Sequence, residues 1–193
     1  MIKSFVPLCI ALNVIVFLLW RTLPREFMFE NFTVSWLALS QSRFWTLVTS
    51  AFSHIELWHL LINMFVLNSF GPVLEHIVGK TSFWRFYIFA AIIGSLAHAV
   101  VSKFLMNQAE LPAVGASGAI AGVILLFALK FPKEKILLFG IVPVPALIGS
   151  MLFIGIDVWG LIAQTKGGGL GIGHGAHLGG SLAGLLYYLM YIK

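Results

Sequence analysis

The sequence predicts an all-α, polytopic membrane protein, with six transmembrane helices in a single domain over residues 1–193. Hydrophobic residues make up 60% of the chain and charged residues 10%, and the mean hydropathy is +0.98. A soluble chain of 193 residues could not bury so much apolar surface in one core. Because a spanning helix needs roughly 20 apolar residues, the chain has room for about six spans and no separate soluble domain.

Six apolar stretches follow one another along the chain. The expected spans are residues 5–20, 56–74, 83–104, 115–129, 145–163 and 172–192. No small-x-small cleavage site precedes Arg21, so the first stretch is expected to be an uncleaved span rather than a signal peptide.

The connecting segments differ in character. Residues 21–55 are too polar to span and rich in aromatic residues, so they are expected to form a loop in the membrane interface. The apolar segment 136–144 runs into Pro143 and Pro145 and is expected to lie at the interface before the fifth span. Four glycines at 167–169 and 171 predict a flexible loop, which we expect to act as a lid.

The net charge and the cysteine content limit the kinds of partner and of cross-link that the protein can have. The net charge of +5 would suggest nucleic acid for a soluble protein, but in a membrane protein it indicates orientation and anionic headgroups. Lys130, Lys133 and Lys135 follow the fourth span and favour an N-terminus on the inner side. The single cysteine, Cys9, excludes an intrachain disulfide and a thiolate metal cluster. The expected partners are therefore the bilayer and other membrane proteins, with no nucleic acid.

Four polar residues are expected at one depth of the bilayer. Spans two, four and six all begin on the outer side, and the first two turns or so of these spans carry His59, Asn63, Ser117 and His177. Polar residues within a membrane are unfavourable and tend to face the bundle interior, where they are candidates for function.

Ser117 and His177 are the candidate nucleophile and base. Ser117 opens a helix, where backbone N–H groups and the helix dipole favour a developing oxyanion. A serine needs a base within hydrogen-bond reach, and His177 is the best candidate. Small residues recur at four-residue spacing in both helices and predict close packing of the two: Gly118, Gly122, Ala176, Gly180 and Gly184.

His59 and Asn63 are four residues apart on one helical face, as two donors to an oxyanion would need to be. Each candidate also has a structural interpretation. A serine beside glycines commonly bonds to the preceding turn of its helix, and an intramembrane asparagine can simply join two helices. The joint occurrence of four such residues at one depth favours the functional interpretation.

These residues resemble the signatures of the rhomboid intramembrane serine proteases. The matching motifs are Gly115-Ala116-Ser117-Gly118, Ala176-His177 followed by Gly180 and Gly184, and His59-x3-Asn63 after Phe52-Ser53-His54. The resemblance covers essentially the whole chain. It implies a Ser–His dyad without an acid, in which Ser117 is the nucleophile and His177 the general base and acid. His59, Asn63 and the Ser117 backbone N–H would then form the oxyanion hole.

The chain departs from the family pattern at two places. Many members carry a tyrosine one turn after the serine that packs on the catalytic histidine, and here that position is Ala121. Something else must therefore hold His177. The loop motif Trp-Arg appears only as Trp45-Thr46, with Arg43 upstream.

Asp157, the only aspartate, falls near the outer end of the fifth span. A triad with His177 is conceivable. However, the resemblance implies a fifth helix that acts as a gate away from the dyad, so a loop-capping or gate contact is the preferred expectation. His54, His98 and His174 are expected to be structural.

No cofactor or metal is expected. The chain has no His-Glu-x-x-His motif, and His174-x2-His177 shows no evident third ligand.

The expected substrates are membrane proteins with a helix-destabilised transmembrane segment. The alternative functions are a non-catalytic rhomboid-like protein that binds transmembrane clients and a small transporter, which internal repeats would favour. The motif wording resembles that of mitochondrial rhomboids. However, the missing extra helix and leader favour a compact bacterial form in the inner membrane, with its N-terminus in the cytoplasm.

Overall fold

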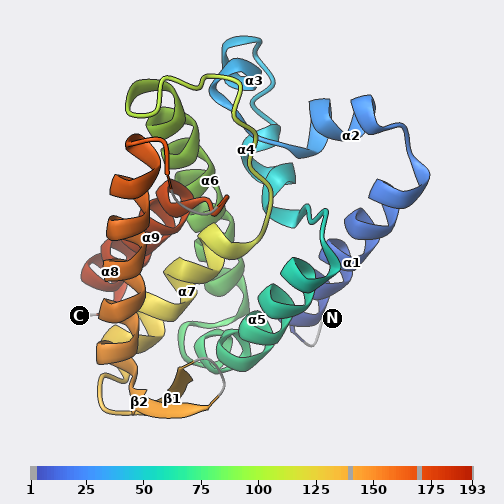
Figure 1. Cartoon of the computed structure of the whole chain (residues 1–193). Helices are drawn as coiled ribbons and strands as arrows, with labels where there is room; N and C mark the ends of the chain where they lie inside the picture. The colour runs from blue at the N-terminus through green and yellow to red at the C-terminus, as the bar shows by residue number, and fades with distance from the viewer. Residues whose placement is uncertain (1–3, 139–140, 169–170, 193) are drawn as a thin grey trace.

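The chain folds into a bundle of helices with one small β-hairpin, as a computed structural model shows (Figure 1). The structure describes residues 4–138, 141–168 and 171–192. The long helices are α1 (Val6–Thr22), α5 (Leu57–Val78), α6 (Lys80–Phe104), α7 (Ser117–Lys130), α8 (Ala146–Thr165) and α9 (His174–Tyr191). Each of the six predicted apolar stretches is therefore helical.

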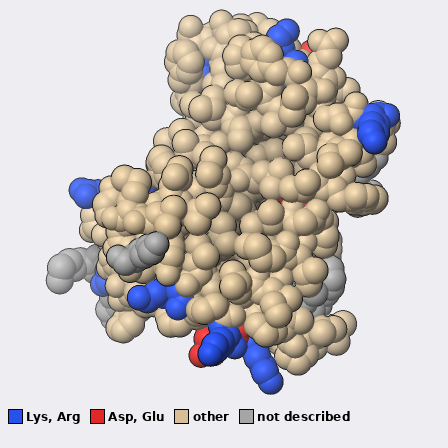
Figure 2. Space-filling view, turned by 90° about the vertical axis from the view of Figure 1, so that its left-hand side faces the viewer, with Lys and Arg blue, Asp and Glu red and all other residues tan. Residues whose placement is uncertain are grey.

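The bundle carries the surface that a bilayer requires. Helices α5, α6 and α8 are long and apolar enough to cross a membrane, and α1 and α7 are shorter apolar helices. Large apolar side chains point outward along them, and Trp58, Phe65 and Trp159 are about 70% exposed. On the face shown in Figure 2, a broad uncharged expanse lies between the charged side chains. The structure thus agrees with a polytopic membrane protein, and the count of six spans stays a prediction.

Segment 21–55 is not an irregular loop. It forms four short helical pieces that gather at one end of the molecule (Figure 1), namely α2 (Arg25–Phe32), α3 (Trp36–Ser40), α4 (Thr46–Thr49) and the 3-10 turn η1 (Ser50–Phe52). Helix α3 begins where the Ser35 side chain accepts a hydrogen bond from the Ala38 N–H, at 3.1 Å. The short helices pair many of the backbone groups of this segment, and its location in the membrane interface stays a prediction.

The apolar segment before α8 contains β-structure, and its location at the interface stays a prediction. Its described residues contribute to an antiparallel pair of strands, β1 (Lys135–Leu138) and β2 (Val142–Pro145), which lies at the end opposite α3 (Figure 1). Pro143 and Pro145 cannot donate backbone hydrogen bonds or continue a helix. A hairpin tolerates them because a two-stranded sheet consists only of edge strands.

Helix α7 lies at the centre and packs against α5, α6, α8 and α9. Its contact with α9 is made backbone to backbone, because a Cβ atom at Gly180 would overlap the Gly118 carbonyl oxygen. A Cβ atom at Gly122 would lie 2.6 Å from the Gly180 carbonyl oxygen. The predicted packing through small residues is therefore confirmed, and it brings the first turns of α7 and α9 together.

Helix α7 has only 14 residues, or about 21 Å of helix against roughly 30 Å of hydrocarbon. The chain must therefore reach its first residue, Ser117, through a non-helical segment. That segment is tied down by a bridge between Ala113 and Val34 and by a 2.9 Å hydrogen bond from the Gly115 N–H to the Ser50 carbonyl. Ser117 is thus held below the end of the bundle that carries α3.

Candidate active site

The turn before Ser117 depends on a glycine. Gly115 has φ +124°, a backbone conformation that side-chain-bearing residues rarely adopt. A Cβ atom there would also lie 2.6 Å from Cε1 of His59. Gly115 therefore allows the chain to turn into α7 and lets the His59 ring lie against that turn.

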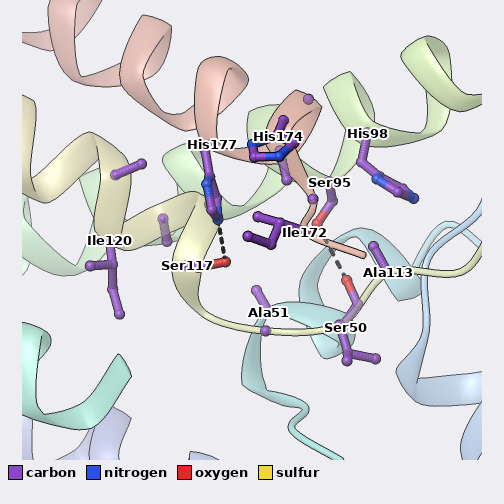
Figure 3. Close-up of a pocket in the computed structure, with 18 of the residues that line it drawn as sticks. Ser50, Ala51, Ser95, His98, Ala113, Ser117, Ile120, Ile172, His174 and His177 are labelled. Atoms are coloured by element: carbon purple, nitrogen blue, oxygen red, sulfur yellow. Dashed lines mark hydrogen bonds between the residues drawn. The ribbon is translucent and has the colours of Figure 1, made fainter. Parts of the chain in front are cut away.

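Ser117 and His177 meet as the sequence predicts. The Ser117 Oγ and the His177 Nε2 are 2.9 Å apart, although the two residues are 60 positions apart in the chain (Figure 3). Both lie in the first turn of their helices, and His177 is 8% exposed. A hydroxyl at this distance from an imidazole nitrogen can give up its proton to that nitrogen.

The His177 ring is fixed by two residues of α8. Phe153 stacks on it, with ring centroids 5.4 Å apart and planes inclined by 28°. Asp157 Oδ1 lies 2.9 Å from Nδ1, the nitrogen that faces away from Ser117. Since Phe153 and Asp157 are four residues apart, they share one face of α8. Many family members are expected to support this histidine with a tyrosine at the position of Ala121. Here Phe153 and Asp157 support the His177 ring instead.

The contact of Asp157 corrects the expectation from sequence. A loop-capping or gate contact was preferred over a triad contact, and that preference was wrong, because Asp157 accepts hydrogen bonds from His177 and from His174. The His174 Nδ1 is 2.7 Å from the same oxygen. Ser117, His177 and Asp157 thus have the geometry of a serine-protease triad.

His174 packs closely against α8. Its ring lies against α8 at Gly160, where an added Cβ atom would overlap the imidazole. Gly160 follows Asp157 by three residues and lies on the same face of α8. The glycine therefore makes the space that lets His174 reach Asp157.

His59 and Asn63 line the same cavity as Ser117 and His177. The cavity has a volume of about 640 Å³ and reaches from α5 to Phe153 of α8. The Asn63 side chain donates to the His59 backbone carbonyl at 2.8 Å, which leaves its second N–H for another acceptor. The two residues share the cavity as predicted, and their role in an oxyanion hole stays a prediction.

The remaining buried histidines support the walls of the cavity. The His54 Nε2 accepts from the Ala116 N–H at 3.4 Å, next to Ser117. Burial, with a smaller contribution from His59, lowers the pKa of His54 from 6.5 to about 3. Its ring is therefore neutral and able to accept at physiological pH. His98 lies 3.1 Å from the Leu111 carbonyl and lines the cavity.

Sequence reasoning missed Phe153 and did not anticipate the contact between His174 and Asp157. The available signal was the four-residue spacing of Phe153 and Asp157, with Gly160 on the same face. The expected lid at 167–173 includes residues 169 and 170, which lie outside the described residues.

Comparison with known proteins decides the family. The rhomboid domain family model matches residues 41–193. The chain belongs to the rhomboid family. Rhomboids are generally intramembrane serine proteases that act on membrane-protein substrates within the bilayer.

The relatives are mitochondrial rhomboids. Rhomboid protein 1, mitochondrial, of Saccharomyces cerevisiae is 37% identical over 96% of this chain and 52% of its own length. RHOMBOID-like protein 12, mitochondrial, of Arabidopsis thaliana is 33% identical over 88% of this chain and 53% of its own. Presenilin-associated rhomboid-like protein, mitochondrial, of Homo sapiens is 34% identical over 92% and 46%. The chain spans about half the length of these relatives.

These relatives overturn one expectation. A compact bacterial form in the inner membrane was expected because the extra helix and leader of mitochondrial rhomboids were not found, and its N-terminus was expected in the cytoplasm. The relatives are mitochondrial, so that expectation was wrong. Chain length was a poor guide because the matching rhomboid region makes up only about half of each relative.

Proposed function

We propose that this rhomboid is an intramembrane serine protease that cleaves transmembrane segments of membrane proteins, with Ser117 as nucleophile and His177 as general base and acid. The observation that carries the proposal is the 2.9 Å contact between the Ser117 Oγ and the His177 Nε2. The mitochondrial relatives favour a mitochondrial membrane as the location. The proposed substrates are proteins whose transmembrane helix is destabilised near the cleavage site, since a regular helix shields its peptide bonds.

The first chemical step is attack by Ser117. Its Oγ bonds to the scissile carbonyl carbon while its proton passes to the His177 Nε2. The carbonyl oxygen becomes an oxyanion, which accepts hydrogen bonds from the Ser117 backbone N–H and from His59 and Asn63. Collapse of this intermediate breaks the C–N bond, and the proton on Nε2 moves to the leaving amine. Water then attacks the acyl-enzyme by the same route.

Asp157 is proposed to hold the base in its active form. A carboxylate only accepts hydrogen bonds, so the Nδ1 of His177 must carry the ring proton and donate it to Oδ1. The Nε2 then has a free lone pair directed at Ser117. When His177 gains the second proton, the adjacent carboxylate stabilises the imidazolium. This extends the dyad implied by the family resemblance to a triad.

The test is covalent labelling in detergent with a fluorophosphonate probe, followed by cleavage of a fluorogenic transmembrane peptide. Wild type should react, and Ser117→Ala and His177→Ala should lose both reactions. Ser95→Ala is the matched control, because Ser95 is a buried serine that lines the same cavity and bonds to Ser50. It should keep both. Absence of labelling in folded wild type would favour the client-binding alternative, and labelling of Ser117→Ala would overturn the assignment of the nucleophile.

A further inference from the structure

Three ligand-bearing side chains converge behind the catalytic histidine. The His174 Nδ1, the His177 Nδ1 and one carboxylate oxygen of Asp157 lie within 4.8 Å of one another, and all three residues are buried. Two imidazole nitrogens and a carboxylate oxygen are a common ligand set for Zn²⁺. We propose that Asp157, His174 and His177 bind a divalent transition-metal ion of the zinc class, and that the bound ion inhibits the protease.

The charge at Asp157 provides an independent reason. Asp157 is 1% exposed, and its Oδ2 is buried without a hydrogen-bond partner among the described residues. Its ion pairs within the described ranges are with His174 and His177, which are neutral unless protonated. A buried carboxylate is unfavourable when its negative charge is not balanced by a positive charge and by hydrogen bonds to both of its oxygens. A divalent cation would neutralise this charge and give the second oxygen a partner.

The ligands are preorganised. Stacking on Phe153 holds the ring of His177, and the close fit at Gly160 holds that of His174. Both histidines line the cavity, and Asp157 lies behind them. Three protein ligands leave a fourth tetrahedral position for water, as in open zinc sites.

Inhibition follows from the tautomer of His177, and this part of the inference rests on the proposed function. A metal ion on Nδ1 needs the lone pair of that nitrogen, so the ring proton moves from Nδ1 to Nε2 and the ring stays neutral. The Nε2 then carries a hydrogen directed at the Ser117 Oγ. It donates to the hydroxyl and cannot accept its proton. The same change at His174 leaves the catalytic residues untouched.

Metal binding is tested directly with Co²⁺, whose visible absorption reports tetrahedral nitrogen and oxygen ligands, on protein purified without a histidine tag. Wild type should bind one ion, which Zn²⁺ displaces and Mg²⁺ does not. His174→Asn should weaken binding at least about tenfold, because its amide can still donate to Asp157 but offers no imidazole ligand. His98→Asn, at a buried histidine of the same cavity, is the matched control and should bind as wild type does. Thermal unfolding checks that each variant is folded.

Inhibition is tested by fluorophosphonate labelling with and without Zn²⁺, each variant being normalised to its own metal-free rate. Wild type should lose labelling in Zn²⁺ and regain it with a chelator, whereas His174→Asn should be insensitive. Equal Co²⁺ binding by wild type and His174→Asn would overturn the site. If wild type were labelled but bound no Co²⁺, the proposed metal site would be overturned and the proposed protease function would stand. If Co²⁺ binding depended on His174 but wild type were not labelled, the proposed protease function would be overturned and the metal site would stand.

Discussion

Two buried carboxylates in this bundle are held by different kinds of donor. Glu75, near the end of α5, accepts from the Ser4 hydroxyl at 2.7 Å and from the Phe5 N–H at 3.0 Å, at the start of α1. Asp157, in α8, accepts from two imidazole rings and keeps one oxygen unpartnered among the described residues. Both residues are at most 5% exposed.

The difference separates a structural acid from a candidate functional one. The backbone amides at a helix N-terminus cannot change their protonation, and they lack partners within their own helix. Glu75 therefore fastens the start of α1 to α5. The donors to Asp157 are titratable groups, and one of them contacts a hydroxyl. The donors, rather than burial, thus distinguish the two carboxylates.

The largest expected effect is on turnover in Asp157→Asn. The asparagine Nδ2 donates where the carboxylate accepted, which favours the wrong tautomer of His177, so kcat should fall on the order of 10²- to 10⁴-fold with little change in KM. Initial rates on the transmembrane peptide measure this. Glu75→Gln is the paired control and should keep kcat per folded molecule. A loss of less than about threefold in Asp157→Asn would leave Asp157 without a role in catalysis.

The converse effect is on stability in Glu75→Gln. The glutamine NH₂ group faces backbone donors, so at least one buried N–H loses its acceptor. The free energy of unfolding should then fall by about 1–3 kcal/mol. Unfolding in mixed detergent measures the change, with Asp157→Asn as the reference. If Asp157→Asn were the more destabilised of the two, the proposed division between structural and functional acid would be reversed.

A smaller effect is expected from Phe153→Ala, which removes the ring stacked on His177 and leaves Asp157 in place. Aromatic contacts contribute about 0.5–1.5 kcal/mol, so kcat should fall roughly 2- to 10-fold. Phe70→Ala removes a different aromatic contact, with Phe127 at 5.0 Å, and should leave kcat unchanged. Equal losses in the two variants would point to a general packing effect instead of support for His177.

The smallest effect concerns His54, a buried imidazole whose Nε2 accepts from the Ala116 N–H. Burial lowers its pKa to about 3, below the unfolded value of 6.5. Its stabilising contribution is therefore complete above pH 6.5 and is lost as the pH falls towards 3. Unfolding midpoints at pH 7.5 and 4.5 should differ more in wild type than in His54→Gln. If the two midpoints differed equally in wild type and in His54→Gln, groups other than His54 would account for the loss of stability in acid.

The sequence determined the membrane class, the six apolar helices and the pairing of Ser117 with His177. These features depend on local composition and on small residues at four-residue spacing, which allow α7 and α9 to pack closely. The rhomboid assignment follows from the same motifs, and the family match confirms it.

Only the tertiary structure decided what holds His177. The rotation of α8 about its axis sets whether Asp157 and Phe153 face α9. Asp157 is buried together with the small residues Gly149 and Gly160, but their spacing alone does not say which neighbouring helix this face meets. The hairpin of β1 and β2 was likewise missed, since a short apolar run between prolines suits several conformations equally well. Local pattern thus determined which helices form, whereas the packing of α8 against α9 determined the neighbours of His177.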